Sequence, residues 1–242
     1  MPTVAELTGV YANFMHGPRR GPDTCGICFN FTRGYDRCYA CGHGQPTLDV
    51  LAPISYSVAR EQLHHALMGY KRLTGDVARR LGVELGAVLW RHLAAHESCI
   101  ARAAGTERFP IVTTVPSGDR ARDDQHPLRW IASQLVGPTR DRHERLLRRS
   151  SRPAHAREFD PGRYEPTRAL SGEAVLLIDD TWTTGANAQS AAAALKDAGA
   201  GTVAAVVIGR HLNRDWHEND LRLRALGESF DWEHCALCGR QD

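Results

Sequence analysis

Two acidic residues end an apolar run near residue 175 and are followed by a loop rich in threonine and glycine. The stretch from Ala174 to Gly185 reads AVLLIDDTWTTG, so Asp179 and Asp180 directly follow four apolar residues. An unbroken apolar run predicts a strand covered on both faces, as in a parallel sheet. Open α/β sheets bind ligands at the carboxyl ends of their strands, where both acids are expected. Carboxylates there can accept hydrogen bonds from vicinal hydroxyls and help to hold Mg²⁺.

The residues after the two acids have the composition of a phosphate-binding loop. They lead into the sequence NAQSAAAALKDAG, which predicts an alanine-rich helix ended by Gly199. A helix start offers free backbone N–H groups and the positive end of the helix dipole. A ribose 5-phosphate group fits both the acids and this loop. The residues expected to contact phosphate and ribose are Thr181, Thr183, Thr184, Gly185, Ala186 and Asn187.

This stretch resembles the signature of type I phosphoribosyltransferases, in which a hydrophobic strand is followed by two acids, a variable pair and Thr-Thr-Gly. The resemblance implies an α/β fold with a parallel sheet flanked by helices, and a donor, 5-phosphoribosyl 1-diphosphate, bound with Mg²⁺. Asp179 and Asp180 would orient the ribose hydroxyls and the metal shell. Many family members carry Thr at the position of Asn187, which can still cap a helix. The alternative is an ordinary strand, loop and helix with a chance acidic pair.

Six of the seven cysteines fall in C-x-x-C pairs. In a chain expected to be cytoplasmic, this spacing favours metal over disulfides. The first two pairs predict one structural zinc site in a ribbon-like segment, because four sulfurs suit tetrahedral zinc. A redox pair or disulfides are the alternative, and His43 could replace one cysteine. A zinc hydrolase is disfavoured, since four thiolates leave no position for water. The expected ligands are Cys25, Cys28, Cys38 and Cys41.

The third pair, Cys235 and Cys238, supplies only two ligands of a candidate second metal site. It could be completed by His217 or His234, bind zinc across a homodimer, or remain two thiols.

The segment between the cysteine pairs and the next strand is expected to be helical. Apolar spacing predicts one helix within residues 55–72 and a second from about Gly75 to Glu97. His92 and His96 are four residues apart and could share a metal, but no third ligand is evident, so they are interpreted as solvated. Cys99 is interpreted as an ordinary buried thiol.

The stretch FPIVTTV, from Phe109 to Val115, predicts a strand that leads into the turn PSGDR. Here the chain resembles the competence protein ComF family, which joins a zinc segment, a short helical region and a phosphoribosyltransferase core. The matching parts are Cys25 to Cys41, Leu63 to Lys71 and Ile111 to Arg210, so the resemblance covers most of residues 23–212. It implies pyrophosphate binding by the turn and a catalytic role for its arginine; a plain β-turn is the alternative. The turn residues are Pro116, Ser117, Gly118, Asp119 and Arg120.

The segment from Thr139 to Tyr164 carries eight arginines. A short strand near Arg145 to Arg149 is expected, followed by a long loop. In phosphoribosyltransferases a mobile loop at this place closes over the donor and excludes water. A solvated basic loop, or a nucleic-acid contact, is the alternative.

Composition limits the remaining possibilities. The 242 residues carry a formal net charge of +2, and a charge this small does not by itself indicate nucleic-acid binding. No apolar run is long enough for a membrane span, and the N-terminus lacks the pattern of a signal peptide. We therefore expect a cytoplasmic protein without membrane partners. The expected segments are a loosely ordered lead-in (1–22), a zinc ribbon-like segment (23–48), a helical segment (49–104), the phosphoribosyltransferase core (105–215) and a tail (216–242). The expected function is pentosyl transfer from the donor to a nitrogen acceptor with release of pyrophosphate. The alternative is a non-catalytic donor sensor or a DNA-linked adaptor.

Overall fold

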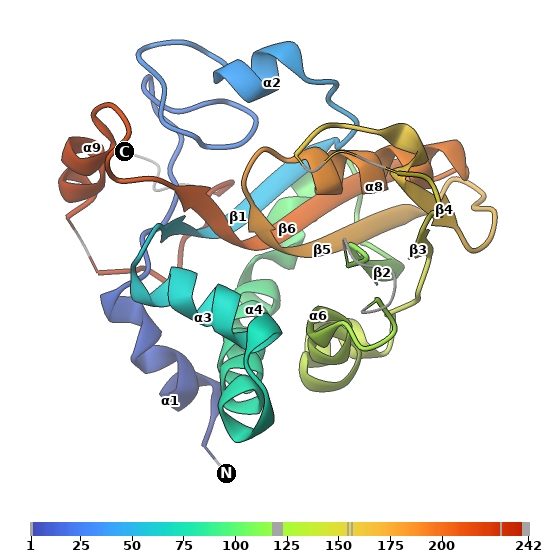
Figure 1. Ribbon diagram of the computed structural model, residues 1–242, viewed down its shortest axis with the longest axis horizontal. Coiled ribbons are helices and arrows are strands. Elements are labelled where there is room, and N and C mark those ends of the chain that lie inside the picture. Colours follow the sequence, from blue (N-terminus) through green and yellow to red (C-terminus); the bar gives the residue numbers. More distant parts are fainter. Residues whose placement is uncertain (1, 118–122, 154, 156, 228, 239–242) are drawn as a thin grey trace.

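A four-stranded parallel sheet lies at the centre of the computed structural model, which describes residues 2–117, 123–153, 155, 157–227 and 229–238 (Figure 1). Its strands, in spatial order, are β1 (Val50–Val58), β6 (Thr202–Leu212), β5 (Ala174–Trp182) and β2 (Ile111–Thr114). The expected α/β class, with a parallel sheet flanked by helices, is confirmed. Strands β3 (Leu147–Arg149) and β4 (Tyr164–Pro166) form a separate antiparallel pair.

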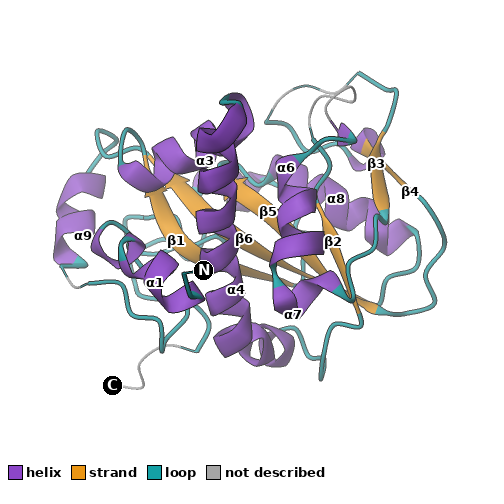
Figure 2. Cartoon of the chain, turned by 90° about the horizontal axis from the view of Figure 1, so that it is seen from below, coloured by secondary structure: helices purple, strands orange, loops and turns teal. Residues whose placement is uncertain are grey.

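Each face of the sheet has its own apolar core. Along β5, Leu176 and Ile178 belong to one core and Val175 and Leu177 to the other, because successive strand residues point to opposite faces. The first face is covered by α3 (Gln62–Arg72), α4 (Gly75–Ala103), α6 (Pro127–Trp130), a π-helical turn (Ile131–Leu135) and α7 (Gly137–Arg140) (Figure 2). The second is covered by α8 (Ala186–Asp197) and the β3–β4 pair.

Residues 50–58, which were expected within a helical segment, instead form strand β1 of the central sheet. The sequence VLAPISYSV is rich in residues that suit a buried strand, and the helical periodicity begins only at Gln62. Ala59 N–H donates to Leu212 of β6 and Tyr56 N–H to His16 on the other side, so by alternation the nitrogen of Pro53 faces β6 and the β1–β6 ladder lacks one hydrogen bond there.

The 29-residue helix α4 is the longest element. Two of its glycines let neighbouring helices approach: a Cβ at Gly82 would lie 3.1 Å from the Trp130 ring, and one at Gly86 would lie 3.4 Å from Ile131. The charges along α4 keep its mean hydropathy low, and among the described residues no helix is both long and apolar enough to cross a membrane.

The N-terminal lead-in is packed, although the sequence analysis expected it to be loosely ordered. Helix α1 (Val4–Gly9) begins with a capping box in which Thr3 and Glu6 bond each other's backbone N–H groups. The Tyr11 hydroxyl then donates to Glu84 of α4 at 2.8 Å, and Met15 is buried in the first core. The capping box starts helix α1, and the Tyr11 hydrogen bond to α4 and the burial of Met15 hold this segment against the first core.

The cysteine segment, expected to be ribbon-like, has little strand structure. In residues 23–48 one isolated bridge joins Thr24 and Phe31, and helix α2 (Tyr39–His43) starts after Cys38. Its four cysteines belong to the second core, packed with side chains of β1 and β5. The segment is therefore a compact cap on the sheet. At the other end, α9 (Asn219–Ala225) precedes a tail whose Phe230 joins the first core.

Candidate active site

The two acids of the central motif lie in the second half of β5 and point to opposite faces of the sheet. Asp179 pairs with Val207 of β6, and both acids are buried, at 9% and 3% exposure. By strand alternation Asp179 lies on the face of α8 and Asp180 on the face of α3. The sequence analysis treated the acids as one unit, and the structure gives them different surroundings.

Asp180 is held by helix α3. Its carboxylate forms an ion pair with the Lys71 ammonium and accepts a hydrogen bond from the Tyr70 hydroxyl at 2.9 Å. Burial alone would raise the pKa of Asp180, but the lysine charge and the two donated hydrogen bonds outweigh burial and lower it. Asp180 is therefore a fixed anion that ties α3 to the centre of the sheet.

Among the described residues, no cation forms an ion pair with Asp179 as Lys71 does with Asp180. Burial, and then the negative charge of Asp180, raise the pKa of Asp179 well above its ordinary value, although the Lys71 charge opposes the shift. Its side chain lines a small pocket at the start of α8. A buried acid with a raised pKa favours a nearby cation or hydrogen-bond donor, because either would stabilise its charged form.

We expect neutral replacements of the two acids to have opposite effects on stability. With a raised folded pKa, Asp179 takes up a proton on folding, so its contribution to stability falls as pH rises from about 4 through that pKa. Asp179→Asn should therefore raise the denaturation midpoint at pH 7.5, and the gain should shrink towards pH 4. Asp180→Asn removes a stabilising anion and should cost about 1–3 kcal/mol at pH 7.5. Asp180 contributes above its unfolded pKa, so this loss should also shrink in acid.

The measurement is thermal unfolding of ligand-free protein from pH 4 to 8. Asp141→Asn, at the exposed residue that follows α7, is the matched control and should shift stability by less than about 0.5 kcal/mol. Equal destabilisation by both active-site variants would contradict the assigned surroundings.

The loop between β5 and α8, called the cradle below, leads into a helix start that could hold a phosphate. Gly185 precedes the helix with φ of +87°, and α8 runs from Ala186 for 12 residues. The pocket at this point has a volume of about 110 Å³, below the 300 Å³ or more typical of a whole cofactor site. It therefore suits one small group, such as a phosphate. Its walls combine Asp179, Arg157 and residues 181–188, which include all six expected phosphate and ribose contacts.

The arginine-rich segment packs beside this cradle. Strand β3 confirms the short strand expected near Arg145 to Arg149. The buried Arg163 guanidinium donates to Asn187 Oδ1 at 2.9 Å, and Thr184 donates to the Arg157 carbonyl at 3.3 Å. The prediction that Asn187 could cap the helix was wrong. Gly185 occupies the N-cap position, and the Asn187 side chain accepts a hydrogen bond from Arg163 instead. The segment before β4 thus covers the start of α8.

The expected pyrophosphate turn is only partly described. Gly118, Asp119 and Arg120 lie outside the described residues. Pro116 and Ser117 follow β2, and the Ser117 N–H donates to Asp123 Oδ1 at 3.0 Å. Asp123 is 2% exposed and also pairs with Arg129 and Arg145, at 3.0 and 2.7 Å. Asp123 was not predicted as a site residue. Its hydrogen bond with Ser117 joins the two residues that flank positions 118–122, next to the carboxyl end of β5.

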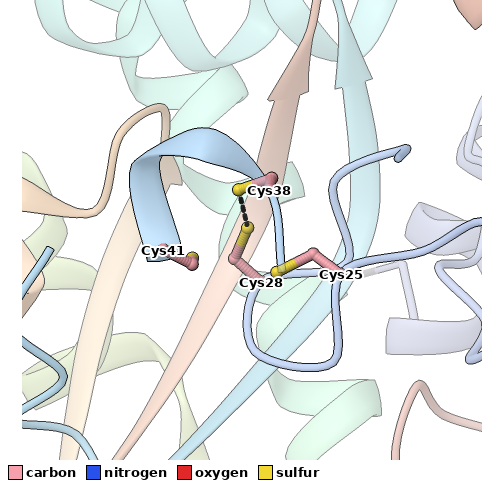
Figure 3. A group of neighbouring side chains, drawn as sticks. All are labelled: Cys25, Cys28, Cys38 and Cys41. Atoms are coloured by element: carbon pink, nitrogen blue, oxygen red, sulfur yellow. Dashed lines mark hydrogen bonds between the residues drawn. The ribbon is translucent and has the colours of Figure 1, made fainter. Parts of the chain in front are cut away.

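The four N-terminal cysteines converge as the spacing predicted (Figure 3). Their sulfur atoms lie within 4.8 Å of one another, all four residues are buried, and Cys28 and Cys38 Sγ are 3.6 Å apart. The group could hold a metal such as zinc, because its four soft donors suit a tetrahedral ion. His43 lies apart from the four ligands: it is exposed, and its Nδ1 contacts the Tyr39 carbonyl.

Arg210 joins the cysteine cluster to the loop between β5 and α8. This β6 residue is 4% exposed and donates from Nε to the Cys28 carbonyl at 2.9 Å. Its Nη1 donates to the carbonyl of Thr183 at 3.2 Å, within the loop after β5. A shift in the cysteine segment would therefore be transmitted to the cradle.

Cys235 and Cys238 lie close to residues that were not predicted as their partners. Cys235 and Cys238 lie with His96 and Cys99 of α4, and the four form a second group that could hold a metal. His96 is 4% exposed and its neighbour His92 2%, so the solvated interpretation was wrong for both. The two histidines proposed as partners have other contacts: His234 binds Asp231 at 2.7 Å, and His217 lies 3.1 Å from Arg33.

Three contacts near the candidate site were not predicted from the sequence. They are the ion pair of Lys71 with Asp180, the hydrogen bond from Ser117 to Asp123, and the contact of Arg210 with Cys28. Each contact joins residues from different segments of the chain, and no local spacing in the sequence signals it. The one available sign was the Tyr-Lys pair that ends the predicted helix before residue 73.

Comparison with known proteins does not identify a family for this chain. No family model matches the chain, and no curated protein matches it.

Proposed function

We propose that the protein binds 5-phosphoribosyl 1-diphosphate at the carboxyl end of β5 and transfers its phosphoribosyl group to a nitrogen acceptor. The observation that carries the proposal is the shared pocket of Asp179 and the start of α8. One wall offers a carboxylate to sugar hydroxyls, and the other offers backbone N–H groups to a phosphate. The likeness of this motif to type I phosphoribosyltransferases and of the chain to the ComF family supports the same function.

Within this proposal each part of the pocket contacts one part of the donor. The backbone of Thr183, Gly185 and Ala186 would bind the 5-phosphate, and Asp179 would accept hydrogen bonds from the ribose hydroxyls. Arg157, which also lines the pocket, would add positive charge near the phosphate. The turn after β2 would receive the pyrophosphate, since β2 lies next to β5 and Val115 N–H donates to Ile178.

The residues present fit Mg²⁺ as a companion of the donor. Asp179 is a buried oxygen ligand whose raised pKa a cation would lower again. When bound, Mg²⁺ would neutralise part of the charge of the pyrophosphate. As the bond from C1 to the pyrophosphate oxygen breaks and pyrophosphate leaves with the electron pair, the carboxylate of Asp179, the acid that lines the pocket, would favour positive charge on the ribose ring. The acceptor nitrogen then bonds to C1 and loses its proton.

Zinc is proposed for the N-terminal cysteines in a structural role. Four thiolates would complete the coordination shell, and Arg210 would carry the rigidity of the cluster to the cradle.

Release of pyrophosphate tests the transferase directly. Protein, donor and Mg²⁺ are incubated with a panel of purine, pyrimidine and other nitrogen acceptors, and pyrophosphate is measured. We expect release that requires an acceptor and falls at least about 100-fold in Asp179→Asn, as is typical when a group that stabilises the transition state is removed. Release unchanged in that variant would contradict the assigned site.

The second candidate is a donor sensor without turnover. It is favoured by the ion pair of Asp180 with Lys71, which leaves only one of the two acids facing the pocket. Saturable donor binding without pyrophosphate release for any acceptor would select it. A DNA-linked role has weaker support, because several arginines of the basic segment already pair with acids: Arg142 with Glu97, Arg145 with Asp123 and Arg148 with Glu165.

A further inference from the structure

Two segments far apart in the sequence bring a histidine and three cysteines to one point. His96 and Cys99 are three residues apart on α4, so both project from the same face of the helix. Cys235 and Cys238 come from the tail after α9. The four ligand atoms all lie within 4.8 Å of one another.

Their spacing is that of a tetrahedral metal shell. His96 Nδ1 lies 4.0 Å from Cys99 Sγ and 3.8 Å from Cys238 Sγ. Zinc bonds of about 2.0–2.3 Å to nitrogen and sulfur place tetrahedral ligands about 3.5–3.8 Å apart. The four donors therefore need only small adjustments to share one ion.

The histidine is oriented as metal-binding histidines are. Its Nε2 lies 2.9 Å from the Trp232 carbonyl, which can only accept a hydrogen bond, so Nε2 carries the proton. The lone pair is then on Nδ1, the atom that faces the sulfurs. A backbone carbonyl that fixes the tautomer in this way is a usual outer partner of a metal-bound histidine.

Backbone N–H groups of the tail point to both sulfurs of the C-terminal pair. The N–H groups of Leu237 and Cys238 point to Cys235 Sγ at 3.4 and 3.3 Å, and the Cys235 N–H points to Cys238 Sγ at 3.1 Å. A disulfide between Cys235 and Cys238 would leave His96 and Cys99 directed at this point without a common partner.

We propose that His96, Cys99, Cys235 and Cys238 bind one Zn²⁺ ion, separate from the N-terminal cysteine cluster. One nitrogen and three sulfurs complete four-coordination, so the ion has a structural role and offers no position for water or substrate. It fastens the tail to α4, where Phe230 joins the first core and Arg91 lies over the Trp232 ring at 4.4 Å.

Metal content of the full-length protein tests the proposal. Wild-type protein purified with zinc should contain two zinc ions per chain by elemental analysis and native mass spectrometry. Cys235→Ser with Cys238→Ser should reduce the content to one. His92→Asn is the matched control, since His92 is buried one turn before His96 but is not a ligand, and it should retain two.

A second measurement needs no variant. Co²⁺ added to metal-free wild-type protein should give thiolate-to-cobalt absorption that saturates at two equivalents, because both clusters contain cysteine ligands. Saturation at one equivalent would overturn the proposal, as would two zinc ions retained by the double serine variant. A single zinc ion with a disulfide in the tail would also overturn it.

Discussion

Replacing Gly185 with alanine is expected to abolish measurable donor binding while the chain still folds. Two constraints act at this residue. Its φ of +87° disfavours any side chain, and a Cβ there would lie 2.2 Å from the buried Trp182 ring. The loop must therefore move, and with it the N–H groups that form the phosphate cradle. We expect a loss of stability of about 1–3 kcal/mol and a fall in donor affinity of more than about 100-fold, which corresponds to the loss of two strong phosphate contacts.

Gly172→Ala separates the strain of the backbone from the loss of the site. Gly172 has a similar φ of +94°, but a Cβ there meets no atom within 4 Å, and the residue precedes β5 at the opposite end from the cradle. This control should lose comparable stability and keep full donor affinity. Calorimetric titration with donor and Mg²⁺, together with thermal unfolding, measures both quantities. Normal donor affinity in Gly185→Ala would contradict the location of the cradle.

Loss of the N-terminal cysteine cluster is expected to have the largest effect on the fold. Structural zinc contributes about 10–16 kcal/mol of binding free energy in small zinc domains, and here the cluster also forms part of the second core. Cys28→Ser with Cys38→Ser should release one zinc ion. Even a loss of about 3 kcal/mol would lower the unfolding midpoint of a chain of this size by roughly 6–12 °C.

The same variant should weaken donor binding at a distance. Arg210 contacts both Cys28 and the loop that contains Thr183, so disorder in the cysteine segment removes one support of the cradle. We expect donor affinity to fall about 10-fold in protein that remains folded at 15 °C. Tyr35→Ser, an exposed position between the two cysteine pairs, should change neither zinc content nor affinity. Full affinity in the zinc-depleted variant would show that the contact of Arg210 with Cys28 is not needed.

The sequence predicted best those features that are encoded locally. The apolar run before Asp179 predicted the buried strand β5, and the C-x-x-C spacing predicted a converging cluster of four sulfurs. Both signals lie within short stretches, where residue type and spacing are sufficient. Strand β3 was predicted near its observed place for the same reason.

Features that depend on contacts between distant segments could not be predicted in this way. Strand β1 was assigned to a helical segment although its residues suit a buried strand, and its pairing with β6 shows that it belongs to the sheet. The different surroundings of Asp179 and Asp180 follow from the packing of α3 on one face of β5. Cys235 was suspected as a metal ligand and lies in a group that could hold a metal, but His96 and Cys99 of that group lie more than 130 residues earlier, on a helix whose histidine spacing pointed elsewhere.

The central claim is that the pocket beside Asp179 binds the pyrophosphorylated ribose donor. The most direct measurement is calorimetric titration of zinc-loaded wild-type protein with 5-phosphoribosyl 1-diphosphate, with and without Mg²⁺, repeated with Asp179→Asn. We predict saturable binding of one donor per chain that requires Mg²⁺ and is lost in the variant, although the variant is at least as stable as wild type at pH 7.5. Absence of binding by the wild type, or equal binding by the variant, would contradict the claim.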